Sequence, residues 1–197
     1  MSERISLYEH ARAFKQAKEV LLSGGVLVYP TDTLYGIGGD ARNPKVVERI
    51  RKIKKKGKGE PFSVILGNLD MVREYADVEG EAERLAVLNL LPGPVTLVTR
   101  EKIKLPVAKD GKIGIRVPEH SFMRKLSTDL GMPIITTSAN RKGKEPPTCI
   151  EEVEKGILEE VDLVLDGGPT IHRKPSTIID LVERKVKRKG ALEGSAP

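Results

Sequence analysis

The chain has 197 residues, of which 39% are hydrophobic and 31% are charged, and its formal net charge is +6. A chain of this length can bury a continuous core as one domain without disulfides or structural metals. The positive charge indicates an anionic partner but does not separate a nucleotide from a nucleic acid. A single cysteine, Cys149, excludes an internal disulfide and favours a reducing compartment. No stretch reaches the ~20 apolar residues of a membrane span, so a soluble cytoplasmic protein is expected.

The first predicted elements are a helix, a strand and a second helix. Ser6 and Glu9 form a capping-box pattern before an amphipathic run that ends at Gly24, which predicts a helix with a glycine stop. A short buried strand is expected at 26–29. Asn43 precedes a proline and a helical spacing of apolar residues, which predicts the start of the second helix.

The later elements continue this alternation. Strands are expected at 62–66, 95–99, 113–117, 133–137, 162–165, 177–181 and 183–188, and a helix at 121–130. Thr148 and Glu151 form another capping-box pattern, which predicts one more helix. Interleaved helices and strands predict an α/β fold with a mixed sheet rather than segregated layers. We find no repeat and no long linker, so one domain over 1–197 with a frayed tail at 194–197 is expected.

Polar side chains follow several predicted strands, and open α/β sheets bind ligands where strands end. The first such segment is 30–36, in which Thr31 and Thr33 flank Asp32. A β-turn accounts for a proline and an aspartate by their backbone preferences, but it does not require two threonines.

A basic run at 49–58 follows the second predicted helix. A solvated face at a helix carboxyl end is the commonest meaning of such a run. The functional alternative is a phosphate clamp, in which Lys54 and Lys56 emerge into a glycine-containing loop. The residues alone leave both interpretations open.

Two further strand ends carry candidate binding groups. Arg116 lies near the end of the apolar strand at 113–117, so its guanidinium needs either a substrate carboxylate or phosphate or an internal Asp or Glu. His120 is more typical of a helix cap or surface group than of a general base. Ser138 and Asn140 either close a turn through bonds to the backbone or hold a nucleotide.

Several standard motifs are missing from the sequence. It has no phosphate-loop pattern, no dinucleotide fingerprint, no zinc-ligand spacing and no Gly-x-Ser-x-Gly elbow. A covalent mechanism is therefore unsupported. The residues by themselves predict a small cytoplasmic α/β protein that binds an anionic ligand.

Six short motifs occur in order along residues 7–192. They are PTDTLYG at 30–36, the pair Lys54 and Lys56 ahead of Pro61, PGPVTLV at 92–98, RVPEH at 116–120, TSAN at 137–140 and STIID at 176–180. This set resembles the Sua5/YrdC/YciO family of threonylcarbamoyl-AMP synthases. The resemblance implies a YrdC-like fold, a twisted mixed α/β sheet with helices on its faces and a basic concave groove, without the extra carboxy-terminal domain of the longer members.

The resemblance also implies an activity. The chain would form threonylcarbamoyl-AMP and pyrophosphate from L-threonine, bicarbonate or CO₂ and ATP, with Mg²⁺ accompanying ATP and no metal ligand from protein side chains. Lys54 and Lys56 would be the catalytic cations. Threonine would contact Thr33, Arg116, Thr136 and Thr177, and ATP would contact Lys54, Lys56, Lys112, Ser138, Asn140 and Arg188. The product would pass to the threonylcarbamoyl-transferase enzymes that modify adenosine 37 of tRNA.

Three positions depart from the family pattern. Lys56 stands where an arginine is usual, Ile65 where the longer members have a histidine that touches threonine, and Pro146 where a serine is usual. Lysine keeps the charge but loses the bidentate fork of arginine. These departures put the fine geometry of substrate contact in question.

Two rival functions follow from the same residues. A basic groove could bind tRNA or other double-stranded RNA without synthase activity, since lysine clusters bind phosphate backbones. Aromatic residues make up 4% of the chain, which disfavours stacking on single strands. A related carbamoyl-transfer role, as in the similar domain of hydrogenase-maturation proteins, is the third reading.

Overall fold

The computed structural model describes residues 2–192, so the predicted frayed tail at 194–197 lies outside the described residues. The strands are β1 (Glu3–Ser6), β2 (Leu27–Pro30), β3 (Tyr35–Gly38), β4 (Ser63–Ile65), β5 (Ala76–Asp77), β6 (Val95–Glu101), β7 (Lys112–Arg116), β8 (Ile134–Ser138), β9 (Leu163–Asp166), β10 (Thr177–Asp180) and β11 (Lys185–Arg188). The helices are α1 (His10–Leu22), α2 (Pro44–Ile53), α3 (Leu69–Tyr75), α4 (Glu81–Leu90), α5 (Ser121–Leu130) and α6 (Lys155–Leu158), with a 3₁₀ turn, η1, at Ile150–Glu152.

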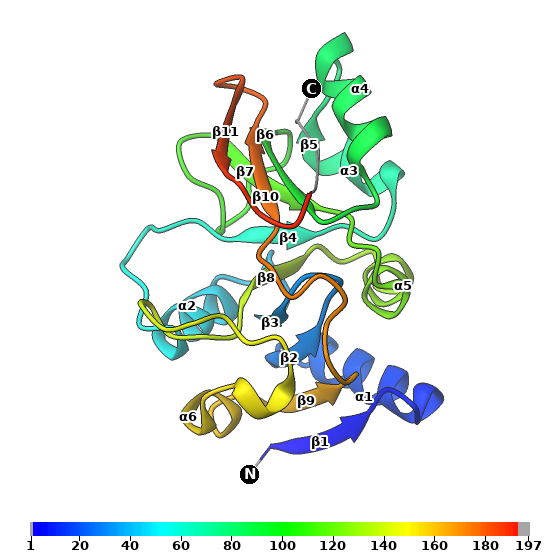
Figure 1. Cartoon of the computed structure of the whole chain (residues 1–197), viewed down its shortest axis with the longest axis vertical. Coiled ribbons are helices and arrows are strands. Elements are labelled where there is room, and N and C mark those ends of the chain that lie inside the picture. Colours follow the sequence, from blue (N-terminus) through cyan, green and yellow to red (C-terminus); the bar gives the residue numbers. More distant parts are fainter. Residues whose placement is uncertain (1, 193–197) are drawn as a thin grey trace.

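All the described strands join one sheet, which rises along the long axis of the molecule from β1 to β11 (Figure 1). The strand order is β1-β9-β2-β3-β8-β4-β7-β6-β10-β11, with β5 paired to β6. The pairs β1–β9, β2–β9, β4–β7 and β6–β10 are parallel, and the other pairs are antiparallel. The predicted α/β fold with a mixed sheet is confirmed.

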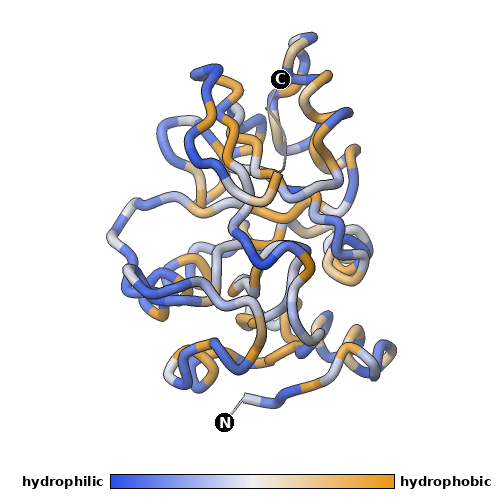
Figure 2. The backbone as a smooth tube through the Cα atoms, in the orientation of Figure 1, coloured by the Kyte–Doolittle hydropathy of each residue, from blue (hydrophilic) through white to orange (hydrophobic). Residues whose placement is uncertain are grey.

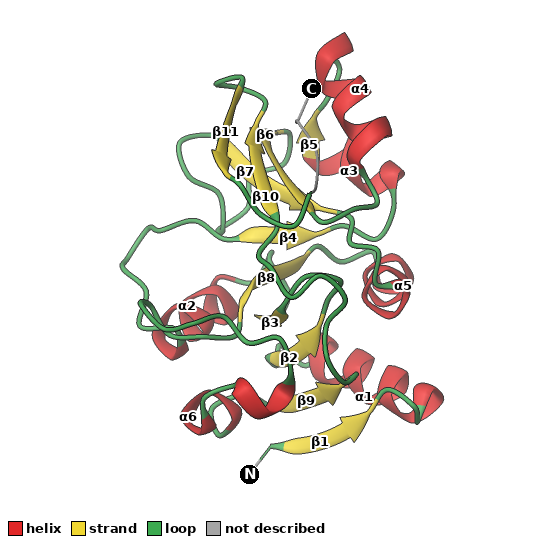
Figure 3. Cartoon of the chain, viewed as in Figure 1, coloured by secondary structure: helices red, strands yellow, loops and turns green. Residues whose placement is uncertain are grey.

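Helices cover both faces of the sheet (Figure 3). Successive side chains of a strand point to opposite faces of the sheet, so neighbouring residues pack into different core clusters. On β2, Val28 belongs to the larger core cluster with residues of α2, α3, α4 and α6, whereas Leu27 and Tyr29 belong to a second cluster with residues of α1 and α5. None of the described helices is both long enough and apolar enough to cross a membrane.

Local sequence signals explain the position of α2. The Asn43 side chain accepts a hydrogen bond from the Lys45 backbone N–H at 3.0 Å, and Pro44 occupies the first turn. The helix ends at Lys54, where the chain enters a loop that bulges to the left in Figure 1 and is hydrophilic in Figure 2. The helix predicted after Asn43 is confirmed, and so is the helix at 121–130.

Both predicted capping boxes are wrong. Ser6 is the last residue of β1, paired with Asp166 of β9, and α1 begins at His10 without a side-chain cap. Thr148 bonds the carboxylate of Glu152 rather than that of Glu151, and only the short 3₁₀ turn follows. In each place the hydroxyl has another partner: the Ser6 hydroxyl accepts from the Tyr8 N–H, and the Thr148 hydroxyl donates to Glu152.

Candidate active site

A cavity of about 700 Å³ lies against seven neighbouring strands, from β3 through β8, β4, β7, β6 and β10 to β11. Eight of the ten residues that the resemblance singles out line it. They are Thr33, Lys56, Lys112, Arg116, Thr136, Ser138, Asn140 and Arg188. The other two, Lys54 and Thr177, are buried outside the lining.

The strand register explains why these residues meet. Ser63 in the middle of the sheet pairs with Thr136 on one side and with Gly114 on the other. Arg116 and Ser138 lie two residues beyond these partners on their own strands. Because residues two apart share a face of the sheet, all five side-chain positions face the cavity.

Arg116 is held from one edge of its guanidinium. Its Nη2 donates to Asp32 Oδ1 at 2.8 Å and to Thr33 Oγ1 at 3.0 Å. The internal carboxylate that the sequence left open as a partner is therefore Asp32. The Nε atom is buried and has no acceptor among the described residues. Arg116 is thus oriented by the protein at the wall of the cavity.

His120 lies at the start of α5, but its side chain accepts no backbone N–H there as a cap would. It is half-buried, and its Nδ1 has no partner among the described residues. Burial lowers the pKa of His120, against the opposing effect of the Asp32 carboxylate. The capping role expected from the sequence is not found.

Lys54 is a buried ammonium at the end of α2. Its Nζ donates to the backbone carbonyl of Ser138 and to that of Asn140, the latter at 2.7 Å. Burial lowers the pKa of Lys54 from 10.5 to about 8, with a further contribution from Lys56. Lys54 therefore holds the turn after β8 in place from behind the cavity wall.

Two arginines of the basic run have structural partners. Arg49 pairs with Asp162 through two contacts of 2.5 and 3.0 Å. Arg51 is buried and donates to the backbone carbonyls of Gly57 and Glu60 at 3.1 and 2.6 Å. Arg51 thereby fixes the loop that follows α2, so part of this run is structural rather than solvated.

Lys56 lies in that loop and lines the cavity. Its Nζ donates to the Pro61 carbonyl at 2.6 Å and lies 4.4 Å from the centre of the Phe62 ring. Burial lowers the pKa of Lys56, against the opposing effect of Glu60. The ammonium is therefore fixed at the rim and partly removed from water.

The turn after β8 presents its side chains to the same space. Ser138 and Asn140 both line the cavity. The Asn140 amide nitrogen donates to the Lys144 carbonyl at 2.6 Å, while its Oδ1 is buried with no partner among the described residues. The turn is therefore fixed through its backbone and one amide group, and it keeps an unused acceptor.

Carboxylates neutralise part of the cationic lining at the β10–β11 end. Lys112 Nζ lies 2.7 Å from Glu183 and 3.9 Å from Asp180. Lys187 lies 2.5 Å from Asp180 and 3.4 Å from Glu183. The lining holds more cations than carboxylates, but these ion pairs mean that the basic character of the groove stays a prediction.

Arg188 and Thr177 hold the end of the described chain beside the cavity. Arg188 donates to the Ser176 carbonyl at 3.1 and 2.9 Å and to the Ser176 hydroxyl at 3.2 Å. Thr177 Oγ1 accepts from the backbone N–H groups of Gly190 and Leu192 at 3.1 and 3.2 Å. Thr177 is therefore committed to the backbone, whereas Arg188 lines the cavity.

Comparison with known proteins decides the family. A family model described as "Telomere recombination", named for Sua5, YciO and YrdC, matches residues 19–190. The chain belongs to the Sua5/YciO/YrdC family. A putative threonylcarbamoyl-AMP synthase of Methanocaldococcus jannaschii is 38% identical over 90% of this chain and 84% of that protein. A threonylcarbamoyl-AMP synthase of Marinobacter nauticus is 32% identical over 84% of this chain and 90% of that protein.

Solved structures of this family share the fold. P. abyssi Sua5 complexed with L-threonine superimposes with a TM-score of 0.86 and 25% identity over 96% of this chain. The present chain spans 57% of the length of that Sua5 chain. E. coli YciO superimposes with a TM-score of 0.84 and 30% identity over 96% of both chains.

The departures from the Sua5/YciO/YrdC pattern occupy different surroundings. Pro146 and Lys56 line the cavity, so these two differences face any ligand there. Ile65 is completely buried in the second core cluster, with residues of α1 and α5, and is outside the lining. The position that the resemblance matches to a histidine of the longer members is thus part of the core in this chain.

The sequence reasoning did not single out several lining residues. They are Ser63, Thr96, Lys109 and Lys187. Ser63 and Thr96 are polar residues within predicted strands, which is a signal that could have identified them, since alternation places one face of a strand toward a ligand. Lys109 and Lys187 carry no such signal, because lysines in loops and edge strands are common.

Proposed function

We propose that this protein is an L-threonylcarbamoyl-AMP synthase, which forms threonylcarbamoyl-AMP and pyrophosphate from L-threonine, bicarbonate or CO₂ and ATP. One observation carries the proposal. A single cavity is lined by an arginine that the protein orients, Arg116, and by two threonines, Thr33 and Thr136. The same cavity is lined by a lysine, Lys56, and by a hydroxyl-bearing turn with Ser138 and Asn140. The names of the relatives and the L-threonine complex of Sua5 support the same function.

The arginine end of the cavity suits the amino acid. An α-carboxylate in the cavity would pair with the Arg116 guanidinium through charge-assisted hydrogen bonds. Thr33 is already fixed by contacts of 3.0 Å to Arg116 and to Thr31 Oγ1, so its hydroxyl is preoriented. Thr136 lies on the same face of the sheet. This arrangement binds a small hydroxylated amino acid without rearranging the wall.

The other end suits the triphosphate. Lys56 and the turn carrying Ser138 and Asn140 supply a fixed ammonium, a hydroxyl and an amide to the phosphate oxygens. Lys112 and Arg188 lie further along the same wall. Lys54 acts indirectly in this arrangement, because its ammonium holds the carbonyls of Ser138 and Asn140.

The chemistry needs positioning and charge rather than a protein nucleophile. The threonine amine captures CO₂ to give a carbamate, whose oxygen attacks the α-phosphorus of ATP and displaces pyrophosphate. Negative charge grows on phosphate oxygens, so cations that are fixed before the reaction stabilise the transition state. When Mg²⁺ is bound with ATP, it neutralises phosphate charge. The cavity lining includes two carboxylates, Asp110 and Glu183, and Glu183 is already paired with Lys112 and Lys187.

We place the product in cytoplasmic tRNA modification. Threonylcarbamoyl-AMP is a mixed anhydride, so a transferase must consume it before water does. The transferase that the family relationship supports moves the threonylcarbamoyl group to the N6 amine of adenosine 37 in tRNA and releases AMP.

An omission assay tests the activity. The protein is incubated with ATP and Mg²⁺, and pyrophosphate release is measured with threonine and bicarbonate together and with each left out. Release should require both. A rate that is indifferent to threonine would contradict the proposal and would favour a different ligand for this fold. Salt-sensitive retention of duplex RNA that ATP does not compete away would instead favour RNA binding.

A further inference from the structure

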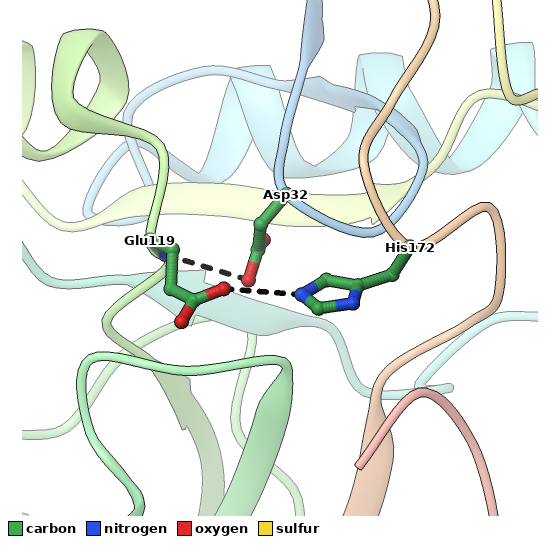
Figure 4. A group of neighbouring side chains, drawn as sticks. All are labelled: Asp32, Glu119 and His172. Atoms are coloured by element: carbon green, nitrogen blue, oxygen red, sulfur yellow. Dashed lines mark hydrogen bonds and ion pairs between the residues drawn. The ribbon is translucent and has the colours of Figure 1, made fainter. Parts of the chain in front are cut away.

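Three side chains from separate segments meet beside Arg116 and outside the cavity lining (Figure 4). Asp32 comes from the turn between β2 and β3, Glu119 from the connection between β7 and α5, and His172 from the connection between β9 and β10. One potential ligand atom of each lies within 4.8 Å of the other two. The fold therefore brings an imidazole and two carboxylates to one point.

The protein fixes this group from several sides. Asp32 is completely buried, and its backbone carbonyl accepts the His172 N–H at 2.9 Å. The Asp32 Oδ1 atom accepts from Arg116 Nη2 at 2.8 Å. Its Oδ2 has only a long contact, 3.4 Å, from the Glu119 N–H. A buried carboxylate oxygen with so weak a partner is costly unless a stronger one is present.

The charge of the group leaves room for a cation. Two carboxylates face one guanidinium, and the third member, His172, is neutral when it serves as a ligand. The His172 Nε2 atom already lies 3.0 Å from Glu119 Oε2. An imidazole nitrogen with two carboxylate oxygens is a ligand set for first-row transition cations, whereas Mg²⁺ and Ca²⁺ prefer oxygen alone.

We propose that Asp32 Oδ2, Glu119 and His172 Nε2 bind one divalent first-row transition cation, of which Zn²⁺ is the representative, with water completing the coordination. Arg116 stays on Asp32 Oδ1, so the carboxylate bridges the guanidinium and the metal. The His172–Glu119 hydrogen bond is exchanged for two metal–ligand bonds, and any proton on the coordinating nitrogen is released. The cation ties the 167–176 connection to the segment before α5 and braces Arg116 from behind.

Metal titration tests this site without substrates, so its outcome is independent of the proposed synthase activity. Metal-free full-length protein is titrated with Zn²⁺ by calorimetry, and thermal unfolding is followed with and without Zn²⁺. The wild-type protein should bind one ion and unfold at a higher temperature with it. His172→Ala and His172→Gln should each weaken binding by about 10-fold or more, as loss of metal-site partners does. Excess Mg²⁺ should not displace Zn²⁺.

Two matched variants serve as controls. His10→Ala removes a histidine of α1, and Cys149→Ser removes the single thiol; both should bind Zn²⁺ as the wild-type protein does. Circular dichroism establishes that each variant is folded. The proposal is overturned if the wild-type protein binds no Zn²⁺, if a folded His172 variant binds it equally well, or if Cys149→Ser abolishes binding.

Discussion

At the scale of single residues, Lys54 and Arg116 have different positions at the cavity wall. Lys54 is buried outside the lining, and Arg116 lines the cavity. The Lys54 ammonium donates hydrogen bonds to two backbone carbonyls of the turn after β8. Arg116 donates from Nη2 to Asp32 and Thr33, and its side chain lines the cavity. One cation therefore positions the site, and the other contacts substrate in the proposed reaction.

The pKa of Lys54 predicts a pH dependence. Burial lowers that pKa to about 8, so the ammonium is charged below pH 8 and neutral above it in the free enzyme. Loss of the charge weakens its bonds to Ser138 and Asn140, so kcat/KM for ATP should fall as pH rises through about 8. The measurement is a pH profile of kcat/KM, which reports free-enzyme groups. Lys54→Arg, which stays charged, should lack this limb; a flat wild-type profile to pH 10 would contradict the assignment.

Replacing Arg116 should affect the amino-acid substrate selectively. Arg116→Lys removes the planar fork and its Nε donor. The loss of a charge-assisted hydrogen bond, about 1.5–3 kcal/mol, predicts a fall of roughly 10- to 150-fold in kcat/KM for threonine. The KM for ATP should change little. Arg49→Lys, at an ion pair outside the cavity, is the matched control and should leave both parameters unchanged.

At the scale of elements, α2 positions the cationic wall. Its carboxyl end delivers Lys54 to the turn after β8, and Arg51 on the same helix fixes the loop that carries Lys56. The helix is located by its first turn, where Asn43 caps a backbone N–H. A local capping interaction therefore helps to place residues on the opposite end of the helix.

The cap should be measurable in stability. Asn43→Ala should lower the free energy of unfolding by about 1 kcal/mol, because it leaves the Lys45 N–H without its acceptor. Urea unfolding followed by circular dichroism gives the difference. Asn43→Ser keeps a capping oxygen and should recover most of the loss. Equal destabilisation by both variants would mean that the amide acts through packing and not through the cap.

At the scale of the whole molecule, the sequence could predict the α/β class but not the strand order. Alternating apolar runs locate most strands, whereas pairing joins segments far apart, such as β10 with β6. Helix α4 was missed because its apolar residues are not confined to one face of the helix, so the sequence shows no clear amphipathic pattern. In the structure, Leu85 and Leu88 are 52% and 60% exposed. Strand β3 was missed because two of its four residues are glycines, which favour turns.

The residues of the candidate site likewise fall into those that the sequence could predict and those that it could not. Eight of the candidate residues line the cavity, and it was the order of the family motifs that singled them out, since strand ends alone indicated only some of these segments. Lys54 and Thr177 could not be placed from sequence, because their partners are backbone groups supplied by the tertiary fold. The sequence predicted no metal ligands from side chains. It could not indicate that Asp32, Glu119 and His172 lie together, because these residues are more than 50 positions apart along the chain.

Detection of the adduct tests the central proposal most directly. The protein is incubated with ATP, Mg²⁺, ¹³C-bicarbonate and ¹⁵N-threonine, and the nucleotides are analysed by mass spectrometry immediately after quenching. One AMP adduct carrying both labels should appear with an equal amount of pyrophosphate, and Arg116→Lys should form much less of it. Pyrophosphate or AMP without a doubly labelled adduct would contradict the proposed function.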